Sequence, residues 1–105
     1  MTIDNTEDAM GTGSHGEVQQ DDGRFRVTRW TIEPGGAIPM HRHEYDYVVV
    51  PLVNGTMHVV TPDGTVTAAE LRIGESYTRT AGVEHQVENR GGADSVVFVE
   101  VERLS

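Results

Sequence analysis

MHRHEYDYVVV, residues 40–50, places two histidines one residue apart directly before an apolar, β-branched run. Such a run favours a β-strand, in which alternate side chains point to the same face. His41 and His43 then project from one surface as a pair of nitrogen ligands that suits a divalent transition metal. Because His-x-His pairs also occur on solvated strands, this stretch alone leaves both a metal site and an ordinary surface strand open.

Short strands separated by turn residues are predicted along most of the chain. Seven segments are rich in β-branched, aromatic or alternating residues, and most of them end at proline, glycine or asparagine. The segments are residues 24–33, 45–53, 56–61, 65–73, 75–80, 84–89 and 94–104. Asn54-Gly55, between the second and third of them, is a strong hairpin signal. Because no helical stretch interrupts the series, the pattern predicts an all-β sandwich or barrel.

Length and composition limit the class of protein. A chain of 105 residues can build one small domain around a single core. With 36% hydrophobic residues it is too apolar for a disordered protein, and no apolar run is long enough to span a bilayer. The absence of cysteine excludes disulfides and thiolate ligands. Any metal must therefore be held by nitrogen and oxygen.

Charge and the N-terminal sequence bear on partners and location. Seventeen acidic and eight basic side chains give a formal net charge of −9, which opposes nucleic acid and anionic membranes, so we expect neither as a partner. Residues 1–21 are polar and without hydrophobic periodicity, which predicts a flexible leader that includes a solvated His15, followed by one domain over residues 22–105. The leader lacks the features of a signal peptide, so we expect a cytoplasmic protein.

The surroundings of the histidine pair resemble the first signature motif of the cupin superfamily. Gly35 begins it, five residues separate this glycine from His41, and His43 follows two positions later. Gly55 stands within one residue of the glycine that closes the family pattern.

A second stretch resembles the other signature motif of the same superfamily. Gly74 is followed by Thr80-Ala81-Gly82, then by His85 and Asn89, at the family's spacing, and only the proline of the pattern is changed, to Thr80. The resemblance covers about residues 24–104. Within the superfamily, the sequence is similar to those of small single-domain cupins grouped with the beta-alanine degradation protein.

The resemblance implies a double-stranded β-helix, or jelly-roll, barrel that forms a homodimer. It also implies that His41, His43 and His85 hold a divalent transition metal, which could be iron, manganese, nickel or zinc. The alternative is a barrel whose histidines line an empty pocket or one for an organic ligand. Met40 and Tyr77, next to the motifs, are further candidates for the pocket lining.

The first motif departs from the family pattern where a glutamate ligand usually stands. The corresponding positions carry Tyr47 and Val48, and strand alternation places Tyr47 on the face of the two histidines. Tyr47 is therefore the candidate catalytic residue, as a hydrogen-bond donor or acid, the alternative being a pocket aromatic. We expect a small metal-binding enzyme with dioxygenase-like or isomerase/lyase-like chemistry on a small molecule, or alternatively a non-catalytic module that binds or senses a small ligand.

Overall fold

The computed structural model describes residues 12–105, and these form nine strands and no helix. The strands are β1 (Ser14–Asp21), β2 (Phe25–Ile32), β3 (Ala37–Arg42), β4 (Tyr47–Pro51), β5 (Gly55–Val60), β6 (Val66–Leu71), β7 (Tyr77–Arg79), β8 (Glu84–Glu88) and β9 (Val96–Arg103). The seven predicted segments correspond to β2 and to β4 through β9. Within the described residues, nothing has the length and apolarity of a membrane-crossing helix.

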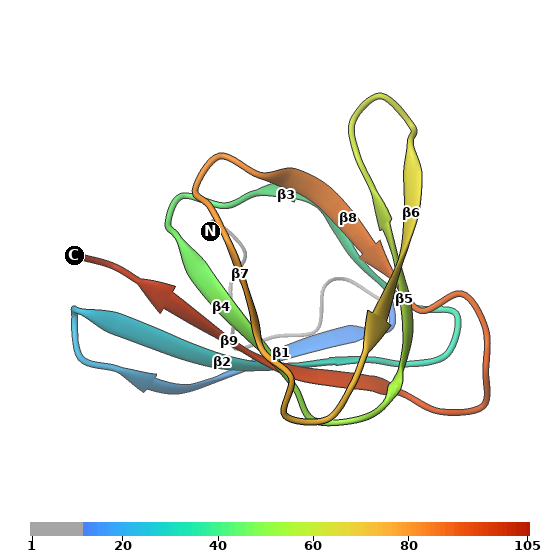
Figure 1. Cartoon of the computed structure of the whole chain (residues 1–105), viewed down its shortest axis with the longest axis horizontal. Coiled ribbons are helices and arrows are strands. Elements are labelled where there is room, and N and C mark those ends of the chain that lie inside the picture. Colours follow the sequence, from blue (N-terminus) through green and yellow to red (C-terminus); the bar gives the residue numbers. More distant parts are fainter. Residues whose placement is uncertain (1–11) are drawn as a thin grey trace.

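Hydrogen bonds join the strands into two antiparallel sheets. One sheet has five strands in the order β1-β2-β9-β4-β7, and the other has four in the order β3-β8-β5-β6. From β3 to β9 the chain changes sheet at almost every connection. Figure 1 shows the two sheets curving around a shared interior, with β3 and β8 on one side of it and β4 and β9 on the other. This arrangement confirms the expected all-β jelly-roll barrel.

Strand β9 contributes both apolar and charged side chains to the buried interior. Its burial alternates, so that Val96, Phe98, Glu100 and Glu102 are buried while the residues between them are half-buried. Arg26 donates to both carboxylate oxygens of Glu102, at 2.9 and 3.3 Å. Two carboxyl groups therefore enter the barrel from one strand, one of them paired with an arginine. The apolar part is a cluster of buried side chains: Trp30, Ile32, Ile38, Tyr47, Val49, Met57, Leu71, Val87, Val96 and Phe98.

Strand β1 corrects the expectation of a flexible leader over residues 1–21. It pairs antiparallel with β2, and Gly16 lies opposite Trp30. The sequence pattern does not predict this strand because its buried positions are the small residues Ser14 and Gly16, which give no apolar alternation. His15 is an exposed side chain of the same strand. Residues 1–11 of the expected leader lie outside the described part of the chain.

Replacing Gly16 by alanine is expected to lower the free energy of unfolding by about 2 kcal/mol, as overpacking does in a filled core. A Cβ at this position would meet three atoms of the Trp30 indole ring at 2.9 to 3.0 Å, and Trp30 is fully buried and cannot move aside. Urea denaturation measures the change, with Gln19→Ala, at an exposed position of β1, as the control. An unchanged midpoint for Gly16→Ala would mean that β1 does not pack on the barrel.

Candidate metal centre

Three histidines converge from neighbouring strands of the four-stranded sheet. β3 and β8 pair so that His41 lies opposite His85. His43 follows the end of β3, where its N–H donates to the carbonyl of Val83 at 2.9 Å and its carbonyl accepts from the N–H of Gly82 at 2.8 Å. Strand pairing thus continues past β3 and holds His43 on the same side of the sheet as His41.

β3 is absent from the predicted segments, although it carries the first of these histidines. It contains Pro39, and its register with β8 shifts between Ile38 and His41. A proline cannot donate to a ladder, and a bulge breaks the alternation by which strands are recognised. The motif spacing nevertheless locates the histidines, because spacing does not depend on that alternation.

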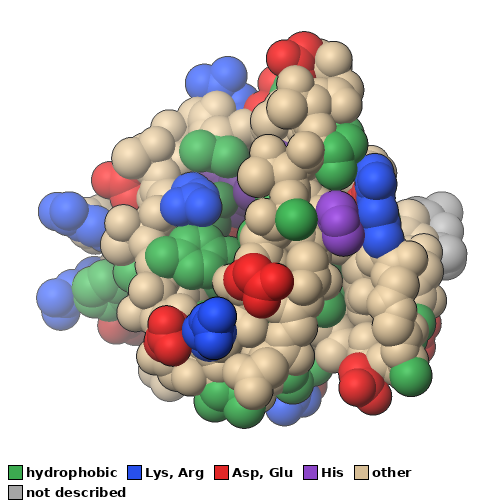
Figure 2. Space-filling view, turned by 45° about the vertical axis from the view of Figure 1, so that its right-hand side comes forward, with side chains coloured by type: hydrophobic (Ala, Val, Ile, Leu, Met, Phe, Trp, Pro, Cys, Tyr) green, Lys and Arg blue, Asp and Glu red, His purple; other side chains and the backbone are tan. Residues whose placement is uncertain are grey.

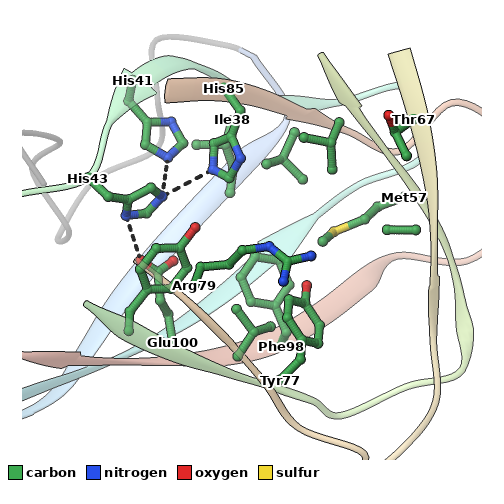
Figure 3. Close-up of a pocket in the computed structure, with 15 residues that line it drawn as sticks. Ile38, His41, His43, Met57, Thr67, Tyr77, Arg79, His85, Phe98 and Glu100 are labelled. Carbon is green, nitrogen blue, oxygen red and sulfur yellow. Dashed lines mark hydrogen bonds and ion pairs between the residues drawn. The ribbon is translucent and has the colours of Figure 1, made fainter. Parts of the chain in front are cut away.

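The three imidazoles face one another across short distances. Nε2 of His43 lies 2.9 Å from Nε2 of His41 and 3.1 Å from Nε2 of His85. Each histidine offers one nitrogen, and these atoms all lie within 4.8 Å of one another. Figure 3 shows the three rings turned toward a common point at one end of a cavity. The structure therefore brings together the three residues that the motifs single out, in a group that could hold a metal ion.

Protonation of the histidines fits a metal site. Nδ1 of His41 lies 2.7 Å from the carbonyl oxygen of Pro39, which only accepts, so Nδ1 carries the proton and Nε2 presents its lone pair to the cluster. Burial, followed by the neighbouring histidine charges, lowers the pKa of His43 to about 3. Burial likewise lowers the pKa of His85 to about 4. All three imidazoles are thus neutral at physiological pH, which is the form that binds divalent metals.

Glu100 is a member of the site that the sequence motifs do not include. It enters from β9 in the opposite sheet, is 4% exposed, and places Oε1 3.4 Å from Nδ1 of His43. Neither of these two atoms has a hydrogen-bond partner among residues 12–105. Burial, followed by the charge of Glu102, raises the pKa of the Glu100 carboxyl to about 8. In the strand sequence VVFVEVER, Glu100 stands two residues after Phe98 and so points to the same, inward face. This alternation is the sequence signal that could have identified it.

Tyr47 lies against the cluster, but not by the strand alternation that predicts it there. β3 ends at Arg42, residues 43–46 are not in a strand, and Tyr47 begins β4 of the opposite sheet, from which it faces the histidines. Its ring stacks on His43, with 4.0 Å between centroids and 23° between planes. The side chain is buried, and burial raises the pKa of its phenol, so it stays protonated. Val48, at the other position where the family carries glutamate, does not line the cavity. No carboxylate therefore stands at the usual glutamate position of the first motif. The carboxyl group that lies beside the cluster belongs to Glu100 of β9 instead.

The cluster forms one end of a cavity of about 240 Å³ inside the barrel. Figure 2 shows a recess in this face of the molecule, with histidine side chains set back inside it and a basic side chain at its edge. Tyr77 lines the cavity as expected, whereas Met40 is exposed and does not. The other lining residues are Ile38, Val49, Met57, Val59, Thr67, Ala69, Arg79, Val87 and Phe98.

The stability of the metal-free protein is expected to peak near pH 6.5, the pKa of an unfolded histidine. Below pH 6.5, the histidines of the unfolded chain take up protons, whereas His43 and His85 of the folded protein stay neutral down to pH values of about 3 and about 4. Protonation therefore favours the unfolded state, and stability falls as pH falls. Above pH 6.5, Glu100 of the folded protein holds its proton up to a pH of about 8, whereas Glu100 of the unfolded chain has already lost it near pH 4.5. Stability therefore falls on this side as well, by about 2 kcal/mol up to the folded pKa of Glu100.

Urea denaturation of chelator-treated protein across this pH range measures the profile. Glu100→Gln should keep the acidic decline and lose the alkaline one, because only the latter depends on the Glu100 proton. A wild-type stability that keeps rising through neutral pH into the alkaline range would contradict this assignment.

Comparisons with known proteins agree with this geometry. A family model described as the cupin domain matches residues 28–102. The chain is 49% identical over 85 residues to the beta-alanine degradation protein BauB of Pseudomonas aeruginosa, across 81% of this chain and 87% of that protein. A solved cupin domain from Bordetella pertussis Tohama I is 42% identical with a TM-score of 0.81, across 89% of this chain and 95% of that one.

A more distant solved structure shares the fold alone. The polyketide cyclase RemF from Streptomyces resistomycificus is 23% identical with a TM-score of 0.69, across 89% of this chain and 66% of that one. At this identity the likeness extends to the barrel and carries no inference about activity.

Proposed function

The chain belongs to the cupin family, and from that premise we propose that it is a metal-dependent enzyme that acts on a small molecule inside its barrel. Its metal ligands are His41, His43 and His85, and the metal is one of iron, manganese, nickel or zinc. The convergence of three Nε2 atoms, two of them 2.9 and 3.1 Å from the third, is the observation that carries the proposal.

The donor set supports a divalent transition metal of intermediate softness. Three neutral imidazoles suit zinc, iron and nickel better than manganese, and a chain without cysteine offers no thiolate to compete. When bound, such an ion supplies a Lewis acid. Its formal charge of about +2 is not reduced, because none of the three protein ligands is a carboxylate. Three protein ligands also leave coordination positions open, as catalytic rather than structural sites do.

The surrounding side chains are proposed to position the small molecule and exclude water. Tyr47 is the proposed catalytic residue, acting as a hydrogen-bond donor beside His43, because burial keeps its phenol protonated. Apolar side chains such as Met57 and Phe98 line the same cavity as the histidines. This apolar lining disfavours water inside the cavity.

Turnover by metal-loaded protein tests the proposal. The assay measures oxygen consumption and product formation with thiols, keto acids, sugars and β-alanine, the last because of the name of the Pseudomonas relative. We expect activity with one substrate class that disappears in His85→Ala and falls in Tyr47→Phe. A fully metal-loaded protein that consumes no oxygen and converts no member of the panel would contradict the enzyme assignment.

A non-catalytic module that binds or senses a small ligand is the second candidate function. The observation that favours it is the absence of the usual motif carboxylate at Tyr47 and Val48. Such a module would show a rise in melting temperature with a ligand and no turnover of it.

A homodimer remains our expectation for the assembly. A single small domain gains buried area by pairing, and the described sheets end in the edge strands β1, β7, β3 and β6. Light scattering that gives a monomer mass at micromolar concentration would contradict it. A cytoplasmic location also stays a prediction, which cell fractionation would check.

A further inference from the structure

Arg79 is the single arginine among the residues that line the barrel cavity. It is the last residue of β7, and its side chain is exposed at the cavity. Figure 3 shows it extending across the cavity, on the side away from the sheet that carries the three histidines. The guanidinium carbon lies 4.7 Å from the centroid of the Tyr77 ring, and Nη1 donates to the carbonyl of Thr78 at 3.0 Å. These contacts fix the direction of the side chain without neutralising it.

The charge of Arg79 has no partner carboxylate in the part of the chain that the structure describes. Three other arginines each pair with a carboxylate: Arg26 with Glu102, Arg29 with Glu17, and Arg90 with Glu88. No ion pair of this kind joins Arg79 to any residue from 12 to 105. A guanidinium presents several N–H donors in a planar fork that matches a carboxylate.

Glu100 is the one carboxyl residue among the described residues that line the cavity. Its Oε1 faces Nδ1 of His43 at 3.4 Å, and no ion pair joins it to Arg79. The cavity is thus positive at Arg79, within a chain whose formal net charge is −9. Such a local reversal of charge favours an anionic ligand at this one place.

The cavity that Arg79 shares with the histidines is largely apolar and small. Ile38, Val49, Met57, Val59, Val87 and Phe98 are among its lining residues, and it measures about 240 Å³. This is below the range of roughly 300–1,000 Å³ that is usual for drug-sized ligands. A fitting ligand therefore has few atoms, an apolar part that packs on these side chains, and an anionic group that reaches Arg79.

Building on the proposed metal function, we propose that the substrate is a small carboxylate with a short apolar chain. Arg79 binds the carboxylate through its guanidinium, and the chain lies along Met57 and Phe98. The other end of the molecule reaches the histidine cluster. Arg79 is thus a specificity-determining residue, which selects an acid over a neutral molecule of the same shape.

A carboxylate could also bind the metal directly, so the test separates the two contacts. Hexanoate and hexanamide, equal in shape and different in charge, are titrated by NMR into metal-free and zinc-loaded protein. In metal-free wild type, hexanoate should bind at least about 10-fold more tightly than hexanamide, which corresponds to about 1.4 kcal/mol. Arg79→Gln should abolish the preference and Arg79→Lys should keep part of it. Arg72→Gln, at an exposed arginine outside the cavity, should leave it intact.

Two results would overturn the proposal. One is a metal-free wild type that does not distinguish the acid from the amide, including one in which the preference appears only with zinc bound. The other is a preference that survives in folded Arg79→Gln. Neither result bears on the metal site, which is measured separately by zinc content. A wild type that takes up no zinc but keeps a preference dependent on Arg79 would reject the proposed metal function and leave the carboxylate site standing.

Discussion

Replacing His85 by alanine should lower the affinity for a divalent metal by about 100- to 1,000-fold. Apparent zinc-binding free energies of about 10–16 kcal/mol are shared among about four ligands in small structural sites, so one ligand accounts for roughly 3–4 kcal/mol. His85 Nε2 faces His43 Nε2 at 3.1 Å, and no carboxylate joins the group of candidate ligands to replace it. The site should therefore fall to two nitrogens in the variant.

Competition titration against a chromogenic chelator measures this affinity. His15→Ala is the matched control, because it removes an exposed histidine of β1 that is not among the candidate ligands. We expect His15→Ala to bind metal as wild type does. Equal affinities for wild type and His85→Ala would show that the metal is held elsewhere.

Glu100→Gln is expected to weaken metal binding by about 10- to 100-fold, although Glu100 is not among the candidate ligands. His43 can offer the lone pair of Nε2 only when its proton is on Nδ1, and Oε1 of Glu100 lies 3.4 Å from that nitrogen. In the metal-free protein burial keeps the Glu100 carboxyl protonated near pH 7, whereas a cation at the cluster favours its ionised form. The resulting carboxylate favours the required tautomer and holds the ring in place. The amide of glutamine keeps the shape and removes the charge, so the loss reports positioning of His43.

The control for this variant is Glu84→Gln, which removes an exposed carboxylate from the residue before His85. A long-range effect of charge on the metal would appear in both variants, whereas positioning would appear in Glu100→Gln alone. Nitrogen-15 chemical shifts of His43 in zinc-loaded protein give an independent readout, because they distinguish the two tautomers. If Glu100→Gln leaves both the affinity and the His43 tautomer unchanged, Glu100 has no positioning role.

The three histidines can be predicted from the sequence because the motifs that contain them are defined by residue spacing along the chain. His41, His43 and His85 meet although the register between β3 and β8 shifts just before the first of them. Tyr47 also reaches them, but from β4 of the opposite sheet, so alternation along a single strand is not what places it there. Spacing rules for motifs can be applied without knowledge of the tertiary contacts.

The members of the site that come from the opposite sheet could not be placed in this way. Glu100 and Arg79 reach the cavity only because β9 and β7 lie across from β3 and β8, which is a property of sheet order. Strand β1 is hidden for a different reason. Its buried Gly16 is selected by the space that Trp30 occupies on β2, and a glycine carries no signal of burial in the sequence.

Metal content of the wild-type protein tests the central claim most directly. Protein purified without a metal-affinity tag is stripped with a chelator, incubated separately with iron, manganese, nickel and zinc, freed of excess metal, and measured by elemental analysis. We predict about one equivalent per chain of at least one metal in wild type and almost none in His41→Ala. Wild-type protein that regains none of the four metals would contradict a metal centre, and would identify the three histidines as donors to an organic ligand in the barrel.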